Sequence, residues 1–278
     1  METPKYWVRP DLSNAEKIRE FERIPLAERD LPNTTYEFLA RAARHNPGGI
    51  AIRYVADPTS DELPEGVTFQ QLLDRIHQVA NLVYSEGLGH GEVVSLLLPN
   101  TPEAQYALWG TQAAAVANPI NWMLEAEGIA AIVKAADSQI LMAYGGDEHI
   151  DIWEKVLRVV ELCPSIRAVV RLGGDRSGRT VEGRRFLDFD AVIDGYRKDA
   201  MDFERKFSGD DLAALFPTGG TTGCPKLVFH SHSNEVISAW LSAAVAGIVE
   251  GESRLSATPL YHVVGAFAGS LATIARGG

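Results

Sequence analysis

The chain has 278 residues, of which 46% are hydrophobic and 23% are charged, a composition typical of a globular protein. Its net charge is −11 and its pI about 5.1, which argues against a nucleic-acid partner because such a partner requires a basic surface. The length allows one large domain or two smaller ones. Two cysteines, Cys163 and Cys224, cannot form a disulfide framework, which indicates a reducing compartment and a cytoplasmic protein.

One uncharged stretch is long enough in principle to span a bilayer. Residues 255–275 contain no Asp, Glu, Lys or Arg. Pro259, Gly265 and Gly269 interrupt this stretch, so we interpret it as a strand and a helix within a core. The N-terminus has no apolar signal-peptide region. The sequence therefore predicts no transmembrane segment.

The first half of the chain alternates between helical and strand-like patterns. Residues 1–33 are charged and show little pattern, and we treat them as an N-terminal extension. Thr34 or Thr35 is expected to cap a helix that stops at Asn46, and Thr68-Phe69 opens a longer helix that ends at Gly87. The remaining predictions up to residue 121 are a strand at 50–55, a buried strand at 93–98, a helix at 103–116 and a turn at 118–121.

The same alternation continues to residue 210. It predicts a helix at 125–136, a strand at 139–143, a helix at 151–162, a strand at 166–171 and a short acidic helix at 187–196. Residues 173–185 contain four glycines and four arginines, which favours a solvated connection over a basic functional patch. Residues 198–210 form a polar linker. This order predicts an α/β fold in which doubly wound, mostly parallel sheets carry flanking helices.

A glycine- and threonine-rich segment follows the apolar run 212–216. It reads Thr218-Gly219-Gly220-Thr221-Thr222-Gly223-Cys224-Pro225-Lys226 and leads into a second apolar run at 227–229. Glycines allow close approach of the backbone, whose N–H groups form a nest for phosphate oxygens. Threonine hydroxyls add donors and Lys226 adds a positive charge. The segment therefore predicts an anion-binding loop.

Other interpretations of this loop fit the sequence less well. A P-loop needs Gly-Lys-Ser/Thr before a helix, whereas here Pro225 and Leu227 flank Lys226 and a β-like run follows. We therefore expect the tip of a β-hairpin, and we disfavour a P-loop nucleotidase. A plain turn without a ligand would need fewer glycines and no lysine. No motif supports Cys224 as a nucleophile.

Two histidine-containing segments follow the loop. On a strand, His230 and His232 would point to one face, but no further metal ligand with suitable spacing follows, so we predict no metal site. Ser233 is a candidate cap for a helix at 235–249. A strand at 255–258 then leads to Pro259-Leu260-Tyr261-His262, at a strand end where α/β sheets bind ligands. Taken alone, His262 is either functional or a structural cap of the next helix.

The segment 218–226 resembles the signature of the AMP-forming acyl-CoA synthetases, a family of adenylate-forming enzymes. The family signature reads Thr-Ser-Gly-Thr-Thr-Gly-x-Pro-Lys, and Gly219 replaces its serine, which removes one hydroxyl. Pro259–His262 with Gly265 is similar to the family's Pro-Leu-Phe-His-x-x-Gly. Weaker similarities are Thr-Phe-x-x-Leu, Pro-Asn and Asn-Pro-Ile-Asn upstream, so the resemblance covers residues 34–278.

The resemblance implies both a fold and a site. The fold would be a truncated form of the N-terminal large domain of adenylate-forming enzymes. It would consist of an extension at 1–33, a first subdomain at 34–200 and the start of a second subdomain at 201–278. Lys226 would neutralise the departing pyrophosphate together with Mg²⁺, and His262 would orient the acyl carboxylate or shape the thiol path. The residues implied to bind the ATP phosphates are Thr218, Gly219, Gly220, Thr221, Thr222, Gly223 and Lys226.

The implied activity is that of a fatty-acid–CoA ligase. A carboxylate attacks the α-phosphorus of ATP, and coenzyme A then displaces AMP. The small and apolar residues at 263–270 favour a fatty acid. The sequence has no match to three further family features: the Tyr-Gly-x-Thr-Glu segment, the ribose-binding aspartate and the C-terminal lysine. We therefore expect an N-terminal portion of such an enzyme that lacks its C-terminal portion and is inactive alone. The alternative is a non-catalytic nucleotide- or acyl-binding remnant.

Overall fold

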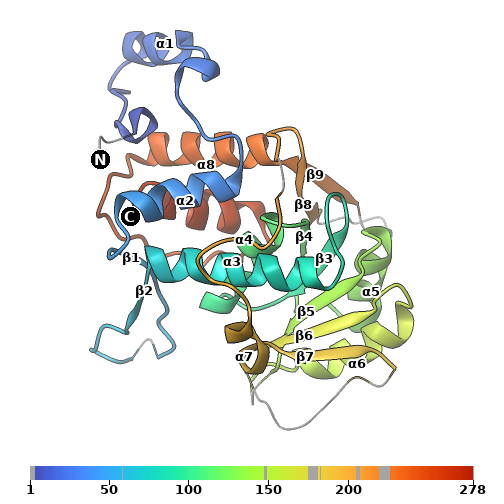
Figure 1. Cartoon of the computed structure of the whole chain (residues 1–278). Coiled ribbons are helices and arrows are strands. Elements are labelled where there is room, and N and C mark those ends of the chain that lie inside the picture. Colours follow the sequence, from blue (N-terminus) through green and yellow to red (C-terminus); the bar gives the residue numbers. More distant parts are fainter. Residues whose placement is uncertain are drawn as a thin grey trace.

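A seven-stranded sheet forms the centre of the molecule (Figure 1). A computed structural model describes residues 4–57, 59–146, 149–174, 181, 183–204, 207–218 and 226–277. The strand order is β7-β6-β5-β3-β4-β8-β9, and every neighbouring pair is parallel except β8 and β9. The strands are β3 (Val93–Leu97), β4 (Val116–Pro119), β5 (Ile140–Tyr144), β6 (Ala168–Leu172), β7 (Arg185–Asp188), β8 (Leu212–Pro217) and β9 (Leu227–Ser231). The predicted α/β class with a mostly parallel sheet is confirmed.

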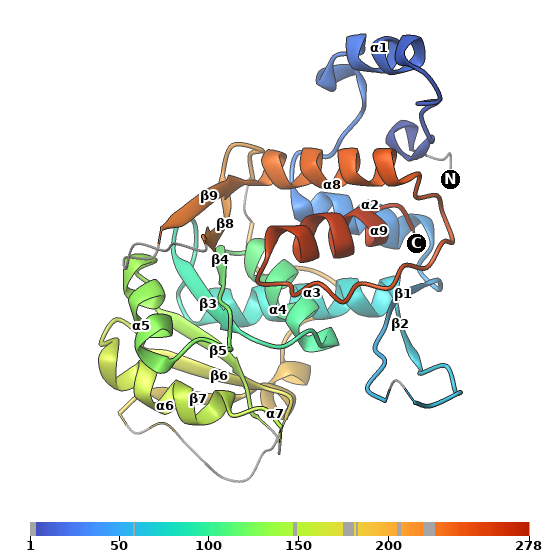
Figure 2. The same ribbon diagram turned by 180° about the vertical axis from the view of Figure 1, so that it is seen from behind.

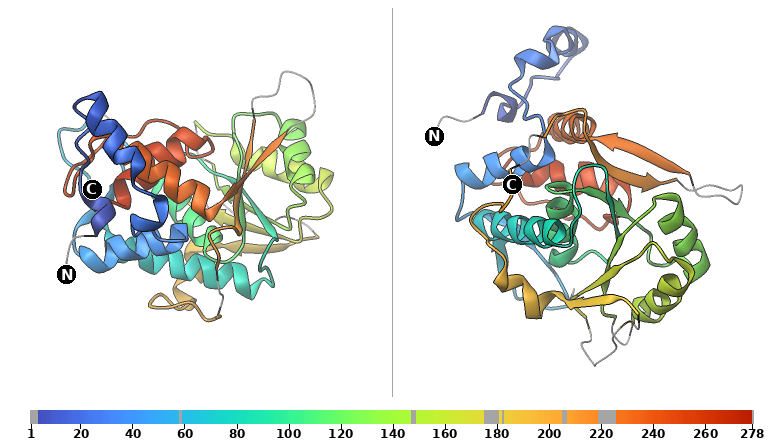
Figure 3. Two further views of the ribbon diagram at one scale, coloured as in Figure 1. Left: turned by 90° about the horizontal axis from the view of Figure 1, so that it is seen from above. Right: turned by 45° about the vertical axis from the view of Figure 1, so that its right-hand side comes forward.

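Helices cover both faces of the sheet, as Figures 2 and 3 show. One face packs against α5 (Ala126–Ala135) and α6 (Ile152–Leu162), and the other against α3 (Phe69–Ser85) and α4 (Pro102–Gln112). Side chains alternate along a strand, so Met142 joins the α3/α4 core whereas Leu141 joins the α5/α6 core. Further helices, α2 (Thr35–His45) and α8 (His232–Ala246), pack outside α3 and α4.

Two helix starts were predicted correctly, and the structure shows a capping residue at each. The Thr34 hydroxyl accepts a hydrogen bond from the backbone N–H of Glu37 at 3.1 Å, so α2 begins at Thr35. At the start of α3, Thr68 and Gln71 form a reciprocal capping box. Each cap satisfies N–H groups that have no partner within the helix, which explains why the local signal was sufficient.

Two short strands of the main sheet were missed in the sequence. Residues 116–119 were assigned to the end of a helix and a turn, but they form β4, which is fully buried between β3 and β8. Residues 185–188 form β7, and the predicted acidic helix shrinks to α7 (Phe189–Val192) followed by the 3-10 turn η3 (Ile193–Gly195). In both cases pairing with a neighbouring strand overrides a weak local propensity.

Two predictions near the C-terminus were also wrong. The helix expected at 235–249 begins at His232, because Ser231 and not Ser233 caps it. The strand expected at 255–258 is absent, and residues 252–257 have no regular secondary structure. They have no strand partner within the described residues, and a strand forms only where a ladder exists. The chain then enters a π-helical stretch, η4 (Val264–Leu271), and α9 (Ala272–Ile274).

The N-terminal extension is structured and contacts the far end of the described chain. It contains η1 (Lys5–Trp7), α1 (Ala15–Arg23) and η2 (Leu26–Glu28), and α1 projects from the body in Figure 1. Trp7 is buried, and its carbonyl accepts a hydrogen bond of 3.0 Å from the Arg276 guanidinium. A small hairpin of β1 (Ile50–Arg53) and β2 (Gly66–Thr68) lies apart from the main sheet.

The main sheet contains strands from both sides of residue 200. The division into subdomains at 34–200 and 201–278 therefore stays a prediction. Among the described residues, no helix is both long enough and apolar enough to cross a membrane.

Replacement of Gly110 tests the contact between α3 and α4. A Cβ atom at Gly110 would lie 2.5 Å from the Cβ of Val79, so Gly110→Ala should lower the free energy of unfolding by about 1–3 kcal/mol. Gly128 on α5 is the control, because its added Cβ would meet only Leu124 Cβ at 3.9 Å. Gly128→Ala should raise stability by about 0.5–1 kcal/mol. Urea unfolding measures both, and equal effects would contradict the packing argument.

Candidate functional site

The predicted hairpin flanks are present on either side of the glycine-rich loop. β8 and β9 pair antiparallel, with Pro217 opposite Leu227, and the N–H of Thr218 donates to the carbonyl of Lys226 at 2.9 Å. The loop residues between them, 219–225, lie outside the described residues, including Gly219, Gly220, Thr221, Thr222 and Gly223. The helix α8 begins only at His232, after β9, so the arrangement differs from a P-loop, in which the helix follows the loop directly.

The parallel pairing places the loop at a defined edge of the sheet. β8 runs parallel to β4, and β4 runs parallel to β3, so the three strands end at one edge. Thr218 follows β8 at this edge, and Asn100 follows β3. Two strand spacings separate β3 from β8, roughly 10 Å. This carboxyl edge is where open α/β sheets bind ligands. Thr218 and Lys226 are both exposed there.

The segment that carries His262 is attached to the same edge. The side chain of Asn100 donates to the carbonyl of Thr258 and accepts from the N–H of Leu260, both at 2.9 Å. Leu260 is buried in the same hydrophobic core as Leu96, Leu98 and Leu108, and it lines a small cavity with these residues and Pro119. A polar clamp and an apolar anchor therefore hold this segment beside the end of β3.

His262 lies at the turn between this segment and η4. Its N–H donates to the carbonyl of Pro259 at 3.0 Å, and its ring Nδ1 accepts from the N–H of Val264 at 3.3 Å. An Nδ1 that accepts a hydrogen bond leaves the proton of the neutral ring on Nε2. The ring is exposed, so Nε2–H is a donor available to a ligand.

Gly265 permits the close approach of η4 to this segment. An added Cβ would lie 2.1 Å from the Pro259 carbonyl oxygen and 2.5 Å from that of Thr258. The sequence pattern matched this glycine without giving a reason, and the structure supplies one. The π-helical turns that follow are wider than α-helical turns and are frequent at functional sites.

Aromatic packing joins the hairpin to η4. Phe216 of β8, His230 of β9 and Phe267 of η4 form a three-ring cluster with centroid separations of 5.2–5.4 Å. Burial lowers the pKa of His230, which favours its neutral form within this cluster. The structure thus brings Thr218, Lys226 and His262 to one end of the sheet.

A buried polar cluster beside the hairpin was not predicted. The Thr35 hydroxyl donates to Gln112 Oε1 at 2.7 Å and lies 3.0 Å from Nδ1 of His232, and Gln112 Nε2 donates to Glu235 at 2.9 Å. All four side chains are buried. His232 is the first residue of α8, so it does not share a strand face with His230 as expected. These contacts span 77–197 residues, and no local signal could have revealed them.

The cluster contains a carboxyl group in an unusual state. Burial raises the pKa of Glu235 from 4.5 to about 8, although the hydrogen bond from Gln112 opposes the shift. Gln112 links this carboxyl group to Thr35 of α2, which in turn contacts His232 of α8. Within the described residues, Glu235 Oε1 has no hydrogen-bond partner. The protonated carboxyl is therefore the favoured form in the folded protein at neutral pH.

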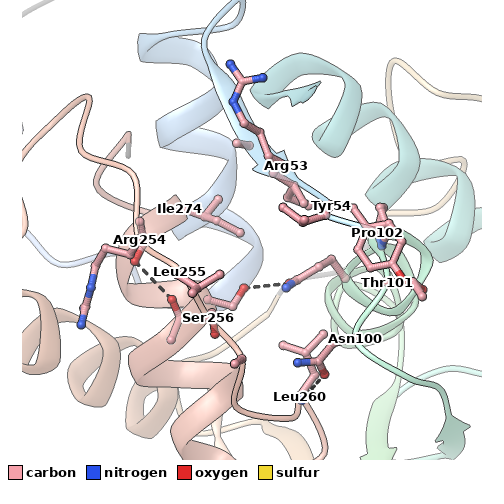
Figure 4. A pocket seen from close by; sticks show the side chains of 18 residues that line it. Arg53, Tyr54, Asn100, Thr101, Pro102, Arg254, Leu255, Ser256, Leu260 and Ile274 are labelled. Carbon is pink, nitrogen blue, oxygen red and sulfur yellow. Dashed lines mark hydrogen bonds between the residues drawn. The ribbon is translucent and has the colours of Figure 1, made fainter. Parts of the chain in front are cut away.

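A groove of about 370 Å³ is lined in part by Asn100, and Figure 4 shows its lining. Arg53 and Tyr54, at the end of β1, line one wall, and residues 254–257 line the other. Asn100 and Thr101, just before α4, also line it, as do Leu260 and residues 269–274 in part. Neither Thr218, Lys226 nor His262 lines this groove.

The fold defines an α/β protein with a candidate ligand site at the carboxyl edge of its sheet. Residues 39–278 match the family model described as AMP-binding enzyme. The chain belongs to the AMP-binding enzyme family.

Relatives and solved structures agree with this membership. The chain is 29% identical over 270 residues to the marinolic acid–CoA ligase of Pseudoalteromonas sp. (strain SANK 73390), covering 95% of this chain and 40% of the relative. It is 27% identical over 199 residues to the long-chain-fatty-acid–CoA ligase FadD13 of Mycobacterium tuberculosis, covering 71% and 36%. The chain thus spans less than half the length of these relatives.

The fold is similar to that of solved adenylate-forming enzymes. The acetoacetyl-CoA synthetase from Streptomyces lividans superposes with a TM-score of 0.77 at 20% identity, covering 88% of this chain and 37% of that one. The anthranilate CoA ligase AuaEII, solved with anthranoyl-AMP, gives a TM-score of 0.76 at 22% identity, covering 89% and 45%.

Replacement of Gly265 tests the packing that holds His262. Gly265→Ala places a methyl group against two backbone carbonyl oxygens, so we expect a loss of about 1–3 kcal/mol in the free energy of unfolding and a shifted NMR signal from the His262 ring. Gly269→Ala is the control in the same helix, because its added Cβ meets the side chain of Ser256, which can rotate away. A smaller effect at Gly265 than at Gly269 would contradict this description.

Replacement of Glu235 tests the buried carboxyl. Its folded pKa is raised, so its contribution to stability is full below about 4.5 and is lost as the pH rises through about 8. We expect the wild type to lose stability relative to Glu235→Gln as the pH rises through this window, so the difference between their free energies of unfolding should fall. Urea unfolding at several pH values measures it, and a flat difference for Glu235→Gln would refute the assignment.

Proposed function

We propose that the chain provides the phosphate-binding part of an ATP-dependent acyl-CoA synthetase of the fatty-acid–CoA ligase type. The observation that carries the proposal is the position of Thr218–Lys226 between β8 and β9, at the sheet edge that also holds the His262 segment. The family membership and the names of the relatives support it.

The loop would bind the triphosphate. Backbone N–H groups of the three glycines and the hydroxyls of Thr218, Thr221 and Thr222 would contact phosphate oxygens. Lys226 is exposed at the sheet edge, which suits a cation that neutralises the departing pyrophosphate. Mg²⁺ would enter with the nucleotide, because this ion is held mainly by substrate phosphates in such sites.

His262 would act on the acyl group. Its exposed Nε2–H can donate to a carboxylate oxygen, which orients the carboxylate for attack on the α-phosphorus and reduces charge repulsion. The same position would lie on the path by which the coenzyme A thiol reaches the acyl carbonyl. The apolar residues of η4, among them the buried Ala266 and Phe267, suit a fatty acid as the substrate.

We propose that the chain binds ATP but does not complete adenylation alone. Groups for adenine, ribose and the second half-reaction, which the family resemblance implies, have no match in its sequence. The reaction would take place in a reducing compartment, the cytoplasm, in keeping with the buried thiol of Cys163.

Removal of the Lys226 ammonium group tests the phosphate site. Lys226→Ala should weaken the binding of Mg²⁺·ATP by about 10–100-fold, the worth of one charge-assisted contact. Lys134→Ala, at an exposed position on α5, should leave binding unchanged. Isothermal titration calorimetry measures both, and equal affinity for Lys226→Ala and wild type would reject the loop as the ATP site.

A second experiment distinguishes ATP binding from catalysis. Fatty-acid-dependent exchange between ATP and pyrophosphate should be undetectable for the chain alone. Exchange above background would show that the chain is competent by itself. If neither binding nor exchange occurs, the proposed function fails.

A further inference from the structure

We propose that Asn100 is a positioning residue for His262: it fixes the segment Thr258–His262 against the carboxyl end of β3. The proposal rests on the proposed function for the role of His262, but the geometry that carries it is independent of that role. Figure 4 shows Asn100 beside Leu260 at the edge of the groove.

The first argument is the pattern of hydrogen bonds. The Asn100 amide donates to the carbonyl of Thr258 and accepts from the N–H of Leu260, both at 2.9 Å. These two groups flank Pro259, which has no N–H of its own. Residues 253–257 belong to no strand within the described chain. The side chain of Asn100 therefore makes the hydrogen bonds that a neighbouring strand would otherwise make. An amide is suited to this because it carries a donor and an acceptor.

The second argument is the rigidity of the platform. Asn100 lies between β3 and α4, and the next residue, Thr101, caps α4 by accepting from the N–H of Ala104 at 3.4 Å. The N–H of Thr101 also donates to the carbonyl of Pro99 at 2.8 Å. Pro102 occupies the first turn of α4, where its fixed φ suits the helix. The amide is therefore presented from a backbone with little freedom.

The third argument is the short path from the clamp to His262. The N–H of His262 donates to the carbonyl of Pro259, the residue between the two clamped positions. Leu260 anchors the same turn in the core, and Gly265 packs on the carbonyls of Thr258 and Pro259. A rotation of this segment would move the His262 ring directly. Active sites of this kind lose efficiency with displacements of about 1 Å.

The chain offers a matched control for this clamp. Asn81 on α3 is also an amide that bridges a loop: it donates to the carbonyls of Arg197 and Ala200 and accepts from the N–H of Asp202. This second clamp holds the loop at 197–202, which carries no candidate site residue. Asn81→Ala therefore removes a similar set of hydrogen bonds without touching the His262 segment.

The experiment measures amide hydrogen exchange at Leu260 and the NMR signal of the His262 ring in the full chain. Asn100→Ala should accelerate exchange at Leu260 by about tenfold or more and shift the His262 signal, whereas Asn81→Ala should change neither. Asn100→Asp keeps the acceptor for Leu260 but loses the donor to Thr258. Asn100→Asp should therefore retain most of the protection of the Leu260 amide from exchange and still shift the His262 signal. This variant replaces Asn100→Ala in the test if Asn100→Ala fails to fold.

Two outcomes would overturn the proposal. One is exchange at Leu260 within twofold of wild type in Asn100→Ala, or an unshifted His262 signal in Asn100→Asp. The other is an equal response of His262 to Asn81→Ala, which would indicate a general loss of stability. Lys226→Ala separates the two hypotheses, because it should weaken ATP binding and leave Leu260 exchange unchanged. Absence of ATP binding in the wild type would reject the proposed function, while the Leu260 result would still decide the role of Asn100.

Discussion

The parallel pairing of β3, β4 and β8 is the constraint on which the site depends. Parallel strands end at the same edge, so the loop after β8 and the turn after β3 lie on one side of the sheet although more than 100 residues separate them in sequence. Asn118 of β4 strengthens this arrangement, because its buried side chain accepts from Ser95 of β3 and donates to the carbonyl of Leu215 of β8. A shift in this register would displace the loop from the His262 segment.

Polar groups inside the helical layer hold the surrounding helices in place. Thr35, Gln112, His232 and Glu235 join α2, α4 and α8, and α8 continues directly from β9. Buried polar groups are costly unless they are hydrogen-bonded, so such a cluster favours one arrangement of these helices over others. The orientation of the hairpin is thereby coupled to the packing of α2 and α4. Burial raises the pKa of Glu235, so we expect the stability of this cluster to depend on pH.

Much of the fold could be predicted from the sequence, but not the contacts that assemble the site. Capping residues such as Thr34 and Thr68 act within one helical turn and fixed two helix starts correctly. The strand β4 was missed because it depends on pairing with β3 and β8, which no local pattern shows. Pro-Asn at 99–100 could be identified as a turn, whereas its amide clamp on Thr258 spans 158 residues and leaves no local pattern. The loop was assigned to a hairpin correctly because its flanking runs are local.

Paramagnetic NMR with ATP tests the central claim most directly, that the hairpin and the His262 segment form one nucleotide site. Mn²⁺ replaces Mg²⁺ on the triphosphate and broadens the signals of nearby residues. We predict that Mn²⁺·ATP broadens the signals of Thr218, Lys226 and His262 together and leaves that of Asn81 sharp. Broadening that reaches the loop but not His262, or that appears only away from this edge of the sheet, would contradict the account.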